Sequence, residues 1–157
     1  IGETHPEFGG SELQKLVDGT ISGQPPFVDL KLEAGRGRSL LDAIRAGLIQ
    51  SAHDLAEGGL AVALAESMVD TNLGATVTVS GDSVTALFSE TQSRYLVSVK
   101  KQNQKQFEKC VKDAFFIGTV TDEARLIVKS EAGTEILNVS HEVIESAWKG
   151  AIPCFMS

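Results

Sequence analysis

The residues best suited to chemistry form one short run near the middle of the chain. Ile49 to Ala52 has the composition of a strand, and His53 and Asp54 follow where open α/β sheets place ligand groups. Gly58 and Gly59 then allow a tight turn before an alanine-rich helix. Free N–H groups at such a helix start can bind a phosphate or a carboxylate. The run predicts a small anion site, although turns with two glycines are also common as plain structure.

A second polar run follows a short apolar segment further along the chain. Its side chains are those of Ser89, Glu90, Gln92, Ser93 and Arg94. The Glu-x-x-x-Arg spacing offers one acceptor and one bidentate donor, which suits a phosphoribosyl or nucleotide ligand. An ion pair between Glu90 and Arg94 within the loop explains the same residues equally well. The residues alone leave both interpretations open.

Three other patterns predict no chemistry. The run that starts at His141 has the first half of a zinc-protease helix, but Glu145 stands where the second histidine belongs. Ser51 lies near His53 without the Gly-x-Ser-x-Gly turn of a hydrolase. Residues 35–38 alternate glycine with arginine but lack the end of a phosphate-binding loop. We therefore expect no metal site at His141, no hydrolase triad at Ser51 and no phosphate-binding loop at residues 35–38.

Composition excludes several classes of protein. The chain has 157 residues, a net charge of −7 and a pI near 4.9, which disfavours nucleic acid as a partner. No apolar run approaches the roughly 20 residues of a membrane span. The two cysteines, Cys110 and Cys154, are far apart, so neither a disulfide framework nor a zinc site is indicated. We expect a cytoplasmic location and no membrane association.

The element pattern alternates helices with strands. Helices are expected at residues 11–19, 33–46, from 60 onward, 102–113 and 141–149, the last capped by Ser140. Strands are expected at residues 49–52, 76–79, 86–88, 95–99, 115–121, 126–128 and 135–139. This alternation predicts an α/β (α+β) fold, a three-layer α/β/α domain with a mixed sheet of about six strands. Residues 1–30 are expected to form a linker with a short helix, and residues 31–157 the domain.

The two polar runs together resemble a known enzyme family. The sequence His53-Asp54-x-x-Glu57-Gly58-Gly59, followed by Leu-Ala-x-Ala-Leu-Ala-Glu, closely resembles a signature of phosphoribosylformylglycinamidine synthase. Residues 89–97 are similar to that family's Ser-Glu-x-x-x-Arg loop, which runs into a strand. Residues 7–13 are similar to the linker into its second carboxyl-terminal repeat, and the resemblance covers essentially the whole chain.

The resemblance implies a place in a larger ligase of purine biosynthesis. That enzyme uses ATP and magnesium to convert formylglycinamide ribonucleotide and glutamine-derived ammonia to formylglycinamidine ribonucleotide. The His-Asp form of the motif matches the carboxyl-terminal half, whose counterpart site is associated with a nucleotide that is not turned over. The resemblance therefore implies no catalytic residue here, and no tightly bound cofactor in the isolated chain. The implied ligand-binding candidates are His53, Asp54, Glu57, Gly58, Gly59, Ser89, Glu90, Gln92, Ser93 and Arg94.

The implied partners are the preceding domains of the same chain and a nucleotide or phosphoribosyl ligand. If Ser157 is the native end, a separate glutaminase subunit is also expected. Two alternatives stay open. The chain could be the equivalent domain of aminoimidazole ribonucleotide or selenophosphate synthetase, against which the match at residues 89–94 argues. It could also be a binding or oligomerisation module without chemistry.

Overall fold

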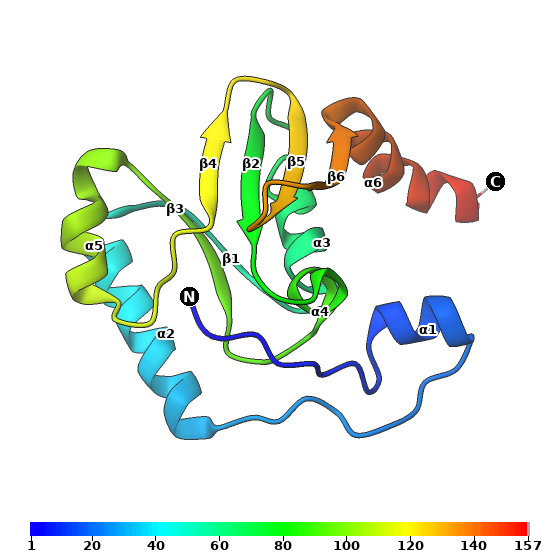
Figure 1. The fold of residues 1–157 in the computed structure, drawn as a ribbon, viewed down its shortest axis with the longest axis horizontal. Helices are drawn as coiled ribbons and strands as arrows, with labels where there is room; N and C mark the ends of the chain where they lie inside the picture. The colour runs from blue at the N-terminus through cyan, green and yellow to red at the C-terminus, as the bar shows by residue number, and fades with distance from the viewer. Residues whose placement is uncertain (157) are drawn as a thin grey trace. The chain divides into compact units, whose positions relative to one another are not determined.

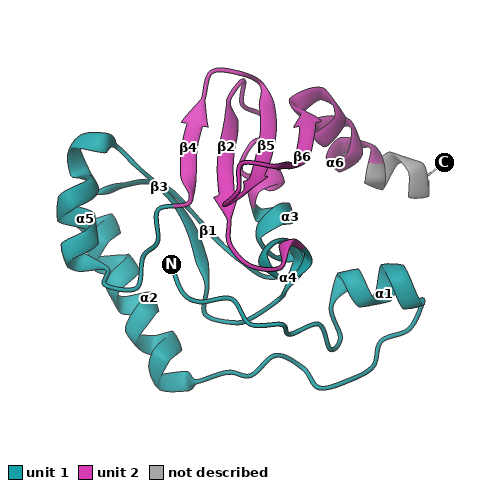
Figure 2. Cartoon of the chain, viewed as in Figure 1, with its two compact units in different colours: residues 1–63, 84–116 teal, residues 64–83, 117–157 magenta. Residues whose placement is uncertain are grey.

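The protein is described here by a computed structural model that covers residues 1–156, with side chains for residues 1–150. Ser157 and the side chain of Cys154, both named above, lie outside the described part. The chain divides into two compact units, which Figure 2 distinguishes by colour. Unit 1 comprises residues 1–63 and 84–116, and unit 2 comprises residues 64–83 and 117–157. The domain boundary expected at residue 30 stays a prediction.

Two helices open unit 1 (Figure 1). Helix α1 (Glu12–Asp18) has the predicted caps: the hydroxyl of Ser11 accepts the N–H of Gln14, and Gly19 has a left-handed φ of 69°. Helix α2 (Leu30–Arg45) starts three residues earlier than expected, because Asp29 caps it by accepting the N–H groups of Lys31 and Leu32. The predicted stop after residue 46 is confirmed.

A two-stranded antiparallel sheet gives unit 1 its core. Strand β1 (Ile49–Asp54) pairs with β3 (Tyr95–Val99), with Asp54 opposite Tyr95. Helix α5 (Gln104–Cys110) lies beside α2 and follows the single turn η1 (Lys101–Asn103) (Figure 1). The fully buried residues between these elements are Ala43, Leu48, Phe107 and Val111.

Two helices each contain residues of both units. Helix α3 (Gly59–Glu66) begins at the second of the two glycines, one residue earlier than expected. Helix α4 (Ser83–Phe88) replaces the strand expected at residues 86–88. Its apolar residues Val84, Leu87 and Phe88 recur at helical spacing, and Leu87 is buried. The strand prediction was wrong because three apolar residues in a row do not distinguish the two structures.

Unit 2 contains a four-stranded mixed sheet in the order β4-β2-β5-β6 (Figure 1). Its strands are β2 (Gly74–Val79), β4 (Gly118–Thr121), β5 (Arg125–Ser130) and β6 (Glu135–Ser140). Strands β2 and β5 run parallel, and the other two pairs are antiparallel. The buried face of the sheet carries Val77, Val79, Leu126 and Val128. Helix α6 (His141–Met156) follows β6 directly, with the hydroxyl of Ser140 accepting the N–H of Val143.

The mixed α/β class is confirmed, with one correction to the sheet. Six strands are present, but two form one sheet and four form the other, so the mixed sheet has four strands rather than about six. The division arises because β1 pairs only with β3 among the described strands, and residues 86–88 are helical. The three-layer arrangement stays a prediction. The helix expected at 102–113 ends at Cys110, since Val111 is extended.

Removal of a core ring should destabilise the chain far more than removal of a surface ring. Phe107 is 5% exposed, and its truncation in Phe107→Ala is expected to lower the free energy of unfolding by about 3–5 kcal/mol. Phe116 is 73% exposed, and Phe116→Ala is the control, with an expected change within about 0.5 kcal/mol. Urea unfolding monitored by circular dichroism measures both. Equal effects would contradict the core described above.

Candidate functional site

The two polar runs singled out in the sequence lie against each other in unit 1. The N–H of Leu55 donates to the carbonyl oxygen of Arg94 at 3.0 Å. The N–H of Gly58 donates to Glu90 Oε1 at 2.8 Å. The turn between β1 and α3 (residues 55–58) therefore packs on the loop between α4 and β3 (residues 89–94), which we call the signature loop.

Two consecutive glycines make this contact possible. Both have left-handed backbones, with φ of 76° for Gly58 and 64° for Gly59. A Cβ on Gly59 would lie 2.5 Å from the carbonyl oxygen of Ser89 and 2.9 Å from that of Leu87. Any larger residue at position 59 would therefore push the signature loop away.

An internal carboxylate occupies the position where the sequence predicts an anion. Glu90 is 8% exposed, and its Oε1 accepts the N–H of Gly58 as well as the N–H of Glu12, the latter at 2.9 Å. The N–H of Gly59 donates to the carbonyl oxygen of Ala56 at 3.1 Å. The expectation of free N–H groups at this helix start is thus corrected at both glycines, because the chain itself supplies their acceptors.

The guanidinium of Arg94 is also directed inward. It is 3% exposed and donates to the carbonyl oxygens of Thr91 and Ser89, at 2.8 and 2.5 Å, and to Thr4 Oγ1 at 2.9 Å. Burial lowers the pKa of Arg94 to about 10, and the nearby charge of Glu7 opposes this shift. Arg94 and Glu90 thus act on different partners rather than on each other. The ion pair considered for the loop is replaced by hydrogen bonds to backbone and hydroxyl groups.

The hydroxyl groups of the signature loop hold residues 1–12. Thr91 Oγ1 accepts the N–H of His5 at 3.0 Å and donates to the carbonyl oxygen of the same residue. Ser89 Oγ donates to that carbonyl oxygen and accepts the N–H of Glu7 at 3.3 Å. Sequence reasoning missed Thr4, His5 and Glu12 as partners of the loop. Nothing in their local sequence indicates a contact with residues more than 70 positions away.

Two further loop residues, Gln92 and Ser93, make hydrogen bonds within the chain. Gln92 is exposed, and its side-chain amide donates to the carbonyl oxygen of Glu90 at 3.0 Å. Ser93 adopts a left-handed φ of 62°, and its carbonyl oxygen accepts Nη1 of Arg36 at 3.1 Å. Arg36 is buried and also pairs with Asp113, so it braces the end of the loop.

Of the remaining candidates, Asp54 and Glu57 are exposed and His53 is half-buried. His53 and Asp54 are the last two residues of β1 rather than residues beyond it. The side chain of Asp54 is 70% exposed, and Oδ1 lies 3.8 Å from Nδ1 of His53. Glu57 is exposed in the turn that follows. The accessible part of the site is therefore acidic, which disfavours a phosphate unless cations from elsewhere offset the charge.

Tyr95 extends the site from the signature loop toward α2. Its hydroxyl donates to Glu33 Oε1 at 2.8 Å. Burial raises the pKa of Tyr95 to about 12, and the hydrogen bond and charge of Glu33 and the charge of Asp54 add to the effect.

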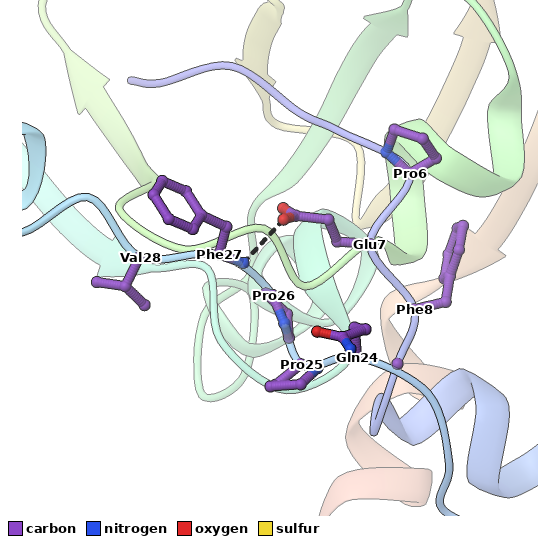
Figure 3. Close-up of a pocket in the computed structure, with 9 residues that line it drawn as sticks. Pro6, Glu7, Phe8, Gln24, Pro25, Pro26, Phe27 and Val28 are labelled. Carbon is purple, nitrogen blue, oxygen red and sulfur yellow. Dashed lines mark hydrogen bonds between the residues drawn. The ribbon is translucent and has the colours of Figure 1, made fainter.

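A separate cavity of about 560 Å³ lies between residues 6–9 and residues 24–28 (Figure 3). Glu7 Oε1 accepts the N–H of Phe27 at 2.8 Å across it, while Glu7 Oε2 is buried without a hydrogen-bond partner among the described residues. The walls are of mixed polarity. Glu7 and Gln24 are polar, and the apolar side chains are those of Pro6, Phe8, Pro25, Pro26, Phe27 and Val28. None of the predicted site residues lines this cavity.

Among the described residues, no three side chains of His, Cys, Asp or Glu come close enough to hold a metal ion. None of the described helices has the length and hydropathy needed to cross a bilayer.

Comparison with known proteins places this geometry in context. Residues 1–131 match the family described as AIR synthase related protein, C-terminal domain. PurL of Thermotoga maritima complexed with FGAR is similar at a TM-score of 0.79 and 20% identity, over 92% of this chain and 26% of that one. Phosphoribosylformylglycinamidine synthase II of the same organism matches at a TM-score of 0.74 and 20% identity, over 92% and 24%.

A hydrogenase maturation protein shares part of the fold. HypE in complex with ATP matches at a TM-score of 0.56 and 14% identity, over 66% of this chain and 39% of that one. At these identities the likeness to the solved structures establishes a common fold. The chain spans about a quarter of the length of the protein in the two Thermotoga structures.

A lysine cannot replace the arginine of the signature loop. Arg94→Lys keeps the charge but loses the planar group that serves three acceptors, so the free energy of unfolding should fall by about 1–3 kcal/mol. Arg38 is exposed on α2, and Arg38→Lys is the matched control, with little expected change. Urea unfolding compares them, and equal stability of the two variants would contradict the buried role of Arg94.

The single tyrosine of the chain provides a direct optical test. Phenolate absorbance should titrate near pH 12 in the folded protein and about 10 when unfolded in urea. Because the folded pKa is raised, this contribution to stability is complete below about pH 10 and is lost as the pH rises toward 12. Glu33→Gln should move the folded value down, and Glu131→Gln, on an exposed residue, should not. A native titration near 10 would disprove the shift.

Proposed function

Since this chain belongs to the AIR synthase related family, as a C-terminal domain, we propose that it serves in formylglycinamidine ribonucleotide synthesis. The complete ligase would convert formylglycinamide ribonucleotide, ATP and glutamine-derived ammonia to formylglycinamidine ribonucleotide. The observation that carries the proposal is the contact between the two signature motifs, through the N–H of Gly58 and the carboxylate of Glu90. The motifs that mark this ligase in the sequence thus meet in one place.

In this proposal the chain has a structural part in the ligase. The charged and hydroxyl groups of the signature loop are used on backbone and on residues 1–12, so they are not available as nucleophiles or bases. His53, Asp54 and Glu57 form the accessible rim of a ligand cleft that other domains of the enzyme complete. No catalytic residue is assigned to the chain.

The residues described here do not fit a site for ATP and magnesium by themselves. The accessible rim carries two carboxylates and no clamp of cations, whereas phosphoryl transfer requires charge neutralisation around the transferred group. No group of three potential metal ligands lies together among the described residues. The proposal therefore assigns ATP, magnesium and the phosphoribosyl phosphate to the preceding domains, which also close the cleft.

The remaining parts of the proposal follow from the ligase assignment. Ammonia would come from a separate glutaminase subunit, and the enzyme would work in the cytoplasm. Nucleic acid is not proposed as a partner, since a net charge of −7 disfavours a polyanion.

The proposal is tested by assaying the complete polypeptide that the gene encodes. It should form formylglycinamidine ribonucleotide from formylglycinamide ribonucleotide, ATP, magnesium and ammonia. Formation of aminoimidazole ribonucleotide or selenophosphate instead would support the related synthetases. Absence of any ATP-dependent product, with the protein folded, would favour a binding or oligomerisation module.

The 157-residue chain alone should show neither amidation nor ATP hydrolysis above background. The reason is that its loop groups are satisfied internally and its accessible rim is acidic. Phosphate release in a coupled assay measures this, with Asp54→Asn as the comparison. Turnover by the chain that Asp54→Asn abolishes would show that catalysis resides here.

A further inference from the structure

Glu90 contacts two parts of unit 1 that are far apart in the sequence. One oxygen, Oε1, accepts the N–H of Glu12 at 2.9 Å and the N–H of Gly58 at 2.8 Å. Glu12 is the first residue of α1 and Gly58 immediately precedes α3. The carboxylate is buried, so water competes little for these hydrogen bonds.

The signature loop holds residues 1–12 at several points besides Glu90. Thr91 exchanges two hydrogen bonds with His5, Ser89 contacts His5 and Glu7, and Arg94 donates to Thr4. The segment is therefore seated as a unit, and its last contact with the loop is the one between Glu12 and Glu90.

The turn on the other side of Glu90 is conformationally permissive. Gly58 and Gly59 lack the side chains that would restrict their backbones. The N–H of Gly58 is directed at Glu90, which orients the peptide group between Glu57 and Gly58. Loss of this acceptor would leave a buried donor unsatisfied unless the turn rearranged.

We propose that Glu90 is a positioning residue that couples residues 1–12 to the turn at residues 54–59. With Glu12 in place, the carboxylate is held where it also orders Gly58. When the segment leaves the loop, Glu90 loses one of its two donors and the turn loses its anchor. The turn carries four candidate ligand residues, Asp54, Glu57, Gly58 and Gly59, so regulation of ligand binding by the segment rests on the proposed function. The coupling itself does not.

One substitution breaks the contact between residues 1–12 and Glu90. Glu12→Pro deletes the N–H that Glu90 accepts and puts its ring Cδ in the place of that hydrogen, so the carboxylate must move away from residue 12. Proline is well tolerated at the first residue of a helix. The preceding residue, Ser11, has φ of −72° and ψ of 158°, which is the conformation that proline favours before it. Glu12→Ala keeps the N–H and removes only a side chain that pairs with Lys15 on the surface, so it is the matched control.

Amide hydrogen exchange, measured by NMR on the chain, tests the coupling. The substitution is at residue 12, and the exchange rate is measured at the amide of Gly58. Glu12→Pro should speed exchange of the Gly58 amide roughly fivefold, the factor for one hydrogen bond of ordinary strength, and Glu12→Ala should not. Glu90→Ala should speed it at least as much. In the Glu90→Ala background, Glu12→Pro should add less than about twofold, because the connection is already gone.

The amide of Val111 serves as the internal reference. It is buried in the core and donates to the carbonyl oxygen of Phe107 at 2.8 Å, so its exchange reports opening of the whole unit. An unchanged Gly58 rate in Glu12→Pro would overturn the proposal. So would an equal effect of Glu12→Pro in the Glu90→Ala background, or equal acceleration at Val111. None of these outcomes depends on an enzymatic activity, so the coupling and the proposed function fail separately.

Discussion

Burial of the signature loop is the constraint on which the arrangement of the candidate site depends. Glu90 and Arg94 are both nearly inaccessible, and a buried charge without partners is costly. The loop meets this requirement with backbone N–H groups for the carboxylate, and with carbonyl and hydroxyl oxygens for the guanidinium. Those partners come from residues 1–12, from the turn before α3 and from the loop itself. The path of the chain around the site is set by these needs.

This internal satisfaction changes how the signature residues are interpreted. A glutamate and an arginine four positions apart suit a phosphorylated ligand in principle, but here both are used inside the chain. The groups that remain accessible, at the end of β1 and in the turn after it, carry negative charge. A phosphorylated substrate would therefore need cations that the described residues of this rim do not supply. That imbalance supports the proposed role in shaping a cleft, with the charged chemistry in other domains of the proposed ligase.

The likeness to a longer protein agrees with the proposal that other domains supply the charged chemistry. The two Thermotoga structures share the fold over nearly the whole of this chain but come from a chain about four times as long. HypE shares the fold over two thirds of the chain, so the architecture by itself does not specify one reaction.

The sequence by itself determined the elements whose signals are local. The caps of α1, the glycine stop after α2, the β-branched residues of β2, β5 and β6, and the two-glycine turn depend on neighbouring residues, and all were predicted. The tertiary structure decided what depends on distant partners. It made residues 83–88 a helix that buries Leu87, divided the strands between two sheets, and directed Glu90 and Arg94 inward. The acceptors and donors of these two residues include Glu12 and Thr4, more than 70 positions away, and no local pattern specifies hydrogen bonds over such a separation.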